Sequence, residues 1–148
     1  MFYATFHNVA GNISYKFCHA TEEVESSSVV KTYSRCGKDI VVWRGFVWMN
    51  APFGERNGLL PWLEKFFEHG NGIALVPDHT SAPWWQQFAP RSELALFVAK
   101  KIKFIGADGK PGKSPAQGTC LLASGRRAIE PLCRARAEQL GVLMRPEP

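Results

Sequence analysis

The chain has 148 residues, of which 45% are hydrophobic and 21% charged, so it has the composition of one folded domain rather than of a disordered protein. Its formal net charge of +5 favours a polyanionic partner. It contains no apolar run of about 18 residues, which argues against a membrane-spanning helix. Residues 1–20 lack the basic-then-apolar pattern of a signal peptide.

The cysteines and histidines show no metal-ligand spacing, and we expect no metal. The cysteines stand far apart, so we interpret them as reduced thiols in a cytoplasmic protein. These residues are Cys18, Cys36, Cys120 and Cys133, and His7, His19, His69 and His79.

Residues 1–38 carry the weakest pattern, and we expect a divergent or truncated leader there, followed by one domain at residues 39–148. Phe2, Tyr3 and Phe6 suggest a short strand or a peripheral apolar anchor. The leader has no glycine-rich strand-to-helix turn of the kind that holds a nucleotide cofactor.

The first strong pattern is the apolar run 46–49, which predicts a buried strand of a parallel sheet. It stops at the polar residue Asn50, and a proline and an aromatic residue, Pro52 and Phe53, follow. In open α/β sheets, ligands bind just past the carboxyl ends of the strands. We therefore expect a ligand at Asn50, Pro52 and Phe53. The alternative is a plain strand exit in which Asn50 starts a turn.

A helix is predicted over residues 62–69, because Pro61 suits the first helical position and apolar residues recur at helical spacing. Residues 72–76 form the next buried strand, which completes a βαβ unit. Its strand ends, at Asn50 and Pro77, would then share one edge of the sheet.

Polar residues 78–81 either cap the next helix or line the site. That helix is predicted over residues 83–88 and contains the adjacent Trp84 and Trp85. Two neighbouring tryptophans cannot both face the core from one helix. One of them is therefore either a stacking candidate or only partly buried.

Residues 93–99 predict a third buried strand, which leads into a segment where lysines alternate with apolar residues. Alternation puts Lys101 and Lys103 on one side of this segment. They either protect an edge strand or contact phosphates. The remaining elements are predicted as a strand at 118–123, a helix at 126–140 and an edge strand at 142–144.

The run Asn50-Ala51-Pro52-Phe53 resembles the (Asp/Asn/Ser)-Pro-Pro-aromatic loop of amino-methyltransferases that act on nucleobases. The resemblance implies that the Asn50 side-chain carbonyl and the Ala51 main-chain carbonyl accept hydrogen bonds from the exocyclic amine of adenine and orient it. Pro52 would shape the loop, and Phe53 would stack on the flipped base. Ala51 stands where the pattern has a proline, so the carbonyl is kept while the fixed φ is lost.

Longer stretches, in the same order and at the same spacing, resemble the phage-type DNA N-6-adenine methyltransferases; they are residues 43–54, 56–58, 61–63, 69–78, 80–85, 101–104 and 112–119. The resemblance implies an α/β fold with a mainly parallel, Rossmann-like sheet flanked by helices. It implies S-adenosylmethionine as the methyl donor and adenine in double-stranded DNA as the acceptor. It also implies a phage or prophage origin, in the setting of DNA modification.

On this basis we expect Asn50 and Asp78 at the donor. The residues expected to contact DNA are Arg56, Asn57, Trp84, Trp85, Lys101 and Lys103. Members of the family carry a Phe-x-x-Asp-x-Ala-(Ala/Ser) segment upstream, which forms part of the donor site, and a Trp-x-Thr-Pro-like segment near their start. Residues 1–42 contain neither.

Two alternatives remain beside the enzyme. An inactive relic that keeps DNA binding predicts an open sheet edge beside Asn50, whereas the enzyme predicts a donor pocket there, built partly by residues before Trp43. A basic, aromatic single-strand-binding module predicts instead that Trp84, Trp85 and the lysines share a groove remote from Asn50.

Overall fold

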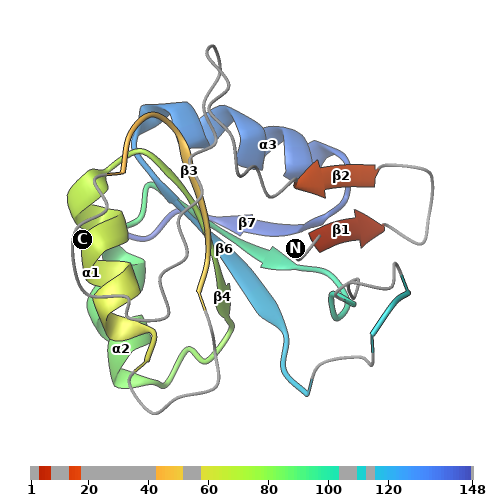
Figure 1. Ribbon diagram of the computed structural model, residues 1–148, viewed down its shortest axis with the longest axis horizontal. Helices are drawn as coiled ribbons and strands as arrows, with labels where there is room; N and C mark the ends of the chain where they lie inside the picture. Colours follow the sequence, from red (N-terminus) through yellow and green to blue (C-terminus); the bar gives the residue numbers. More distant parts are fainter. Residues whose placement is uncertain are drawn as a thin grey trace.

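The computed structural model describes residues 4–7, 14–17, 43–51, 58–103, 110–112 and 116–147. Its main body is a five-stranded sheet with helices on both faces (Figure 1). The strands lie across the sheet in the order β3 (Val47–Asn50), β4 (Gly72–Pro77), β6 (Thr119–Ser124), β5 (Leu94–Val98) and β7 (Gly141–Met144). The helices are α1 (Leu60–His69), α2 (Pro83–Phe88) and α3 (Ile129–Ala137), with short 3-10 turns at Ala89–Arg91 and Arg126–Ala128. Strands β1 (Ala4–His7) and β2 (Ser14–Phe17) form a separate antiparallel pair.

Each face of the sheet has its own apolar core. Helices α1 and α2 cover one face, which we call the α1/α2 face, and α3 covers the other, the α3 face (Figure 1). The α1/α2 core includes Val47, Met49, Leu63, Phe66, Phe88, Cys120 and Leu122. The α3 core includes Ile73, Leu75, Leu96, Leu121, Leu132 and Ala135. Because successive strand residues point to opposite faces, a residue's position along its strand tells which core it joins.

Helix α1 is where the sequence predicts it. Pro61 lies in its first turn, where a missing N–H costs nothing. Leu63 and Phe66 belong to this helix and are fully buried, and the burial of each side chain stabilises the fold by about 1.5–3 kcal/mol. Gly70 ends the helix in the left-handed conformation, with φ of 68°, and its N–H donates to the Phe66 carbonyl.

The segment before β3 is hydrogen-bonded to the end of α1, and the start of β3 packs closely against the start of β4. The Gly45 carbonyl accepts hydrogen bonds from His69 Nε2 and from Asn71 Nδ2, each at 2.8 Å. At the start of β4, a Cβ on Gly72 would lie only 2.1 Å from the Val47 carbonyl oxygen. The two strands can therefore run this close only because residue 72 is glycine.

The prediction of a mainly parallel, Rossmann-like sheet is wrong. Among the described strands, β3 and β4 are the parallel pair, whereas β4 with β6, β5 with β6, and β5 with β7 are antiparallel. The physical reason is β6, which lies inside the sheet and has all six residues buried. A strand buried on both faces is a continuous apolar run, the pattern typical of parallel sheets, and the run does not reveal its direction.

Strands β3, β4 and β5 nevertheless point the same way, because β6 is antiparallel to both β4 and β5. Their carboxyl ends and the start of β6 therefore share one edge of the sheet, which we call the carboxyl edge. The predicted domain boundary at residue 38 lies outside the described residues. No helix in the described part of the chain is long and apolar enough to cross a membrane.

Candidate functional site

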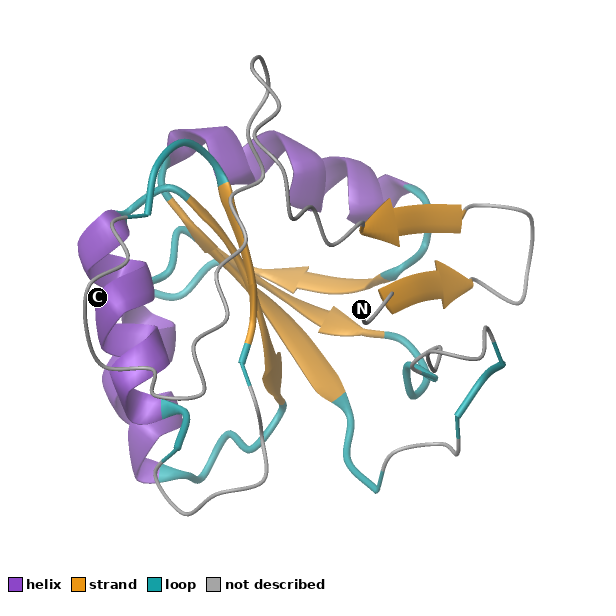
Figure 2. Ribbon diagram, viewed as in Figure 1, coloured by secondary structure: helices purple, strands orange, loops and turns teal. Residues whose placement is uncertain are grey.

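The carboxyl edge brings together the end of β3, the loop after β4, the segment after β5 and the start of β6. The loop that follows β4 and the residues before β6 lie side by side, since the Asp78 N–H donates to the Gly118 carbonyl at 3.2 Å. Figure 2 shows these loops at the lower end of the sheet, away from the start of β3 and the end of α1. The expected shared edge of Asn50 and Pro77 is confirmed, because β3 and β4 are parallel.

Asn50 and Ala51 end β3 on opposite faces of the sheet. Asn50 lies opposite Leu75 of β4, is half-buried and belongs to the α3 face. The methyl group of Ala51 is buried in the α1/α2 core, with 4% of the residue exposed. Packing in the core therefore holds Ala51 in place, although Ala51 lacks the fixed φ of a proline. The rest of the predicted loop, Pro52 and Phe53 with Arg56 and Asn57, lies outside the described residues.

Asp78 is held in place by its main chain on both sides. Its N–H donates to the Gly118 carbonyl, and its carbonyl accepts from the Thr80 N–H at 2.9 Å. The carboxylate rests against Gly118, because a Cβ on that residue would lie 2.2 Å from Asp78 Oδ2. Asp78 is half-buried and forms no salt bridge with the described residues. A fixed carboxylate is thus available to accept hydrogen bonds at this edge.

Side-chain hydrogen bonds also hold the loop after Asp78 in place. Gln86 Nε2 donates to the Thr80 carbonyl at 2.6 Å, and His79 Nε2 lies 3.1 Å from Gln117 Oε1. The N-cap residue of α2 is Ala82, which has no side-chain cap. The helix thus begins at Pro83 without a polar side chain at its N-cap, and residues 78–81 remain at the edge of the site.

Cys120, next to Asp78 on the α1/α2 face, is a structural thiol. Burial, and secondly the charge of Asp78, raise the pKa of Cys120 from 9.0 to about 12. A thiol with so high a pKa stays protonated at neutral pH and is a poor nucleophile. Cys120 therefore supplies packing rather than covalent chemistry.

The two adjacent tryptophans differ in burial. Trp85 is buried in the α1/α2 core, 5.8 Å from Phe97 between ring centroids. Trp84 is half-buried and packs its ring edge-on against Trp85 at 5.7 Å. Trp84 is therefore the better placed of the two to stack with a ligand, and Trp85 holds it there.

The lysine segment after β5 is anchored by one apolar residue. Ile102 is buried in the α3 core, and Lys101 and Lys103 on either side of it are exposed. Lys101 Nζ donates to the Ala116 carbonyl at 2.7 Å, which ties this segment to the residues before β6. Lys100 has a left-handed backbone, with φ of 64°, which is uncommon for a residue with a side chain. These residues are not paired as a strand, so they are not the lysine-protected edge strand that was the alternative.

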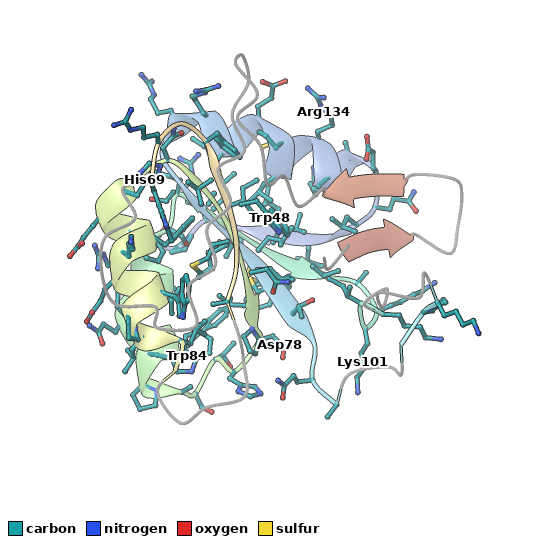
Figure 3. All side chains as sticks on the ribbon, in the orientation of Figure 1. Trp48, His69, Asp78, Trp84, Lys101 and Arg134 are labelled. Atoms are coloured by element: carbon teal, nitrogen blue, oxygen red, sulfur yellow. The ribbon has the colours of Figure 1, made fainter. Side chains whose placement is uncertain are left out.

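Figure 3 shows Trp84, Asp78 and Lys101 along the lower margin of the molecule, with His69 and Arg134 in its upper half. The described candidates thus lie on the side where β3 and β4 end, with Asn50 on the α3 face and Trp84 on α2, which covers the other face. The structure also adds Gly118, against which the Asp78 carboxylate rests. No sequence signal assigns Gly118 to the site, because its place beside Asp78 depends on the antiparallel direction of β6.

The described residues contain no cluster of three or more His, Cys, Asp or Glu side chains that could hold a metal ion. Comparison with known proteins identifies no relative: no family model, no curated protein and no solved structure matches the chain.

Proposed function

We propose that this chain transfers a methyl group from S-adenosylmethionine to the exocyclic amine of an adenine in double-stranded DNA, which leaves S-adenosylhomocysteine and releases one proton of the amine. The observation that carries the proposal is the position of Asn50 and Ala51. They end β3 at the edge where β4 and β5 also end, and the same edge carries the fixed carboxylate of Asp78 after β4 and the exposed lysines after β5. The resemblance of residues 50–53 to the base-binding loop of amino-methyltransferases supplies the chemistry.

In this proposal the protein acts by orienting the exocyclic amine of adenine. The adenine amine is a poor nucleophile, because its lone pair is conjugated into the ring. The Asn50 side-chain carbonyl and the Ala51 main-chain carbonyl accept its two hydrogens, which favours a pyramidal nitrogen with its lone pair directed at the methyl group. The burial of the Ala51 side chain limits the movement of this second acceptor.

The donor supplies an electrophilic methyl group, and one described side chain suits it well. Asp78 is half-buried, braced by its main chain and without a salt-bridge partner among the described residues, so it can accept hydrogen bonds from the donor's ammonium group or ribose hydroxyls. The donor contacts expected from residues before Trp43 fall outside the described residues.

DNA is the partner that charge favours. The net charge is +5, and the exposed lysines stand at the same edge as Asn50. Trp84 offers a half-buried ring on that side. The proposed setting is a phage- or prophage-encoded enzyme acting in the bacterial cytoplasm.

The first experiment is calorimetric titration of the chain with S-adenosylmethionine, followed by transfer of a labelled methyl group to adenine-containing DNA. We expect one donor per chain, and we expect Asn50→Ala to abolish transfer while donor binding falls much less. The matched control is Gln87→Ala, which removes an exposed amide on α2 and should leave transfer unchanged.

A folded chain that binds no donor contradicts the stand-alone enzyme. If that chain still binds DNA, an inactive relic or a nucleic-acid-binding module is the better account. One observation favours the binding module: Trp84 packs on the buried Trp85, which would hold it as a rigid stacking surface. Its prediction of a groove remote from Asn50 fits less well, since Lys101 and Asn50 belong to the same edge.

A further inference from the structure

Strand β7 lies at the edge of the five-stranded sheet and has an exposed apolar side. It pairs with β5, and among the described strands none pairs with its other side. Val142 and Met144 are 60% and 55% exposed, and they are the exposed large hydrophobic side chains of the described residues. They lie opposite Phe97 and Ala95, which belong to the α1/α2 face, so α1 and α2 leave β7 uncovered there. An unpaired apolar edge strand is a template for pairing with another chain.

One hydrogen bond shows which main-chain groups of β7 point outward. The Ala99 N–H donates to the Leu140 carbonyl at 2.8 Å, immediately before β7 begins. In an antiparallel pair, residues alternate between bonding to the neighbouring strand and pointing away from it. The even-numbered residues of β7 therefore bond to β5, and the odd-numbered ones point outward; these are Gly141, Leu143 and, just beyond the strand, Arg145. Within the described residues, their outward N–H and C=O groups have no main-chain partner.

A second copy of β7 can satisfy all of these outward groups in one register. An antiparallel pair with its two-fold axis at Leu143 sets this residue opposite its own counterpart and Gly141 opposite the partner's Arg145. These are hydrogen-bonded pairs, because they join the residues that point outward. Pro146 has no N–H to donate, but it follows the outward residues and is not needed.

The same register brings the exposed side chains of the two copies together. Val142 lies opposite the partner's Met144, and the two-fold axis repeats this contact on the other side. These are the non-hydrogen-bonded pairs of the ladder, in which opposite side chains are closest. Each exposed apolar side chain on β7 is thus covered by one from the second copy.

Charge complementarity favours the same partner. Beyond β7 the chain reaches Glu147, which is exposed. The register carries this carboxylate to the partner's Gln139, in the turn that follows α3. The partner's Arg136 stands at the end of that helix, is exposed and forms no salt bridge with the described residues. Each end of the paired strands therefore joins an acidic residue of one copy to a basic residue of the other.

We propose that two copies of this chain form a dimer by pairing their β7 strands, which joins the two five-stranded sheets into one. This inference does not depend on the proposed function. One strand from each copy carries most of the interface, so we expect a weak, reversible dimer rather than an obligate one. The two-fold axis reverses the strand direction, so the carboxyl edges of the two copies face opposite ways.

The first test is sedimentation velocity at chain concentrations from about 1 to 200 μM, the range in which a weak dimer forms. The wild-type chain should shift from monomer to dimer as the concentration rises. The double variant Val142→Lys, Met144→Lys should stay monomeric, because like charges then face each other in both cross-strand pairs. Both positions are exposed, so the variant should fold, which its melting temperature checks. Ser81→Lys with Gln87→Lys adds the same charge at exposed positions away from β7 and is the matched control.

The second test examines the register. The double variant Val142→Lys, Met144→Glu sets a cation opposite a carboxylate in each cross-strand pair when the axis lies at Leu143. It should dimerise at least about ten-fold more tightly than the double-lysine variant, and this gain should shrink as the salt concentration rises. A register that sets residue 142 opposite itself would bring two lysines together and give no such gain.

Three outcomes would overturn the inference. The first is a wild-type chain that stays monomeric up to about 200 μM. The second is a dimer that persists in the double-lysine variant, because the dimer would then form through another surface. The third is a lysine–glutamate variant that dimerises no better than the double-lysine variant, since the proposed pairing requires residue 142 to face residue 144 of the second copy.

Discussion

At the scale of single residues, Gly118 decides where the Asp78 carboxylate lies. The carboxylate occupies the space that a side chain at position 118 would take, with Oδ2 only 2.2 Å from the ideal Cβ position. The main chain around Asp78 is hydrogen-bonded on both sides and cannot easily move away. A side chain at residue 118 therefore has to displace the carboxylate.

Gly118→Ala should weaken binding of S-adenosylmethionine about ten-fold while the chain stays folded, because the displaced carboxylate no longer meets the donor. Calorimetric titration measures this affinity. Asp78→Asn is the companion variant, and the double variant should bind no more weakly than Asp78→Asn alone. Additive losses would show that Gly118 acts independently of Asp78.

At the scale of elements, the segment after β5 uses one buried residue to present two exposed cations. Ile102 is anchored in the α3 core, whereas Lys101 and Lys103 are exposed. Lys101 also holds the residues before β6 through the Ala116 carbonyl. The two lysines should therefore have different roles, one partly structural and one for phosphate contact.

Lys103→Gln should weaken DNA binding equally on all sequences and make the slope of log affinity against log salt shallower by about one unit. Binding isotherms at several salt concentrations measure this slope. Arg127→Gln, which removes an exposed cation at the opposite edge of the sheet, is the control. An equal change of slope in the control would show that DNA is not confined to the carboxyl edge.

The parallel pairing of β3 with β4 depends on a close approach at Gly72. A Cβ there would meet the Val47 carbonyl oxygen, which belongs to the main chain and cannot rotate away. Gly72→Ala should therefore lower the free energy of unfolding by about 1–3 kcal/mol, as overpacking does in cores. Urea denaturation measures it. Ser81→Ala, in an exposed loop, should stay within about 0.5 kcal/mol of wild type.

At the scale of the whole molecule, stability should depend on alkaline pH through Cys120. The thiol has a pKa of 9.0 when unfolded and about 12 when folded, because burial and the Asp78 charge oppose the thiolate. Between these values the unfolded chain loses a proton that the folded chain keeps. Stability is therefore complete below pH 9 and falls as the pH rises, by about 1.4 kcal/mol per unit.

Urea denaturation between pH 8 and about pH 10.5 tests this contribution. Lysines and tyrosines also titrate there, so the readout is the difference in slope between the wild-type chain and Cys120→Ala. Wild type should lose stability more steeply above pH 9. Parallel slopes would mean that the Cys120 thiol ionises alike in both states.

The sequence predicts the elements of this molecule well and their arrangement only in part. The helix at Leu60–His69 and the strands on either side of it follow from local signals, namely a proline, a glycine and apolar periodicity. The sheet was mispredicted because β6 is apolar on both faces, a pattern that does not record direction. Gly118 was missed for the same reason, since its place beside Asp78 depends on the direction of β6.

The central position of β6 also has a consequence for the order of folding. Strands β3 and β4 with α1 form a local unit, whereas β5 reaches β4 only through β6, which comes more than 40 residues after β4 along the chain. During synthesis from the N-terminus, β4 and β5 wait with unpaired edges until residues 119–124 insert between them. The insertion of β6 therefore joins the two parts of the sheet in one late, long-range step, which we expect to be slow and to leave the nascent chain prone to aggregation until it is complete.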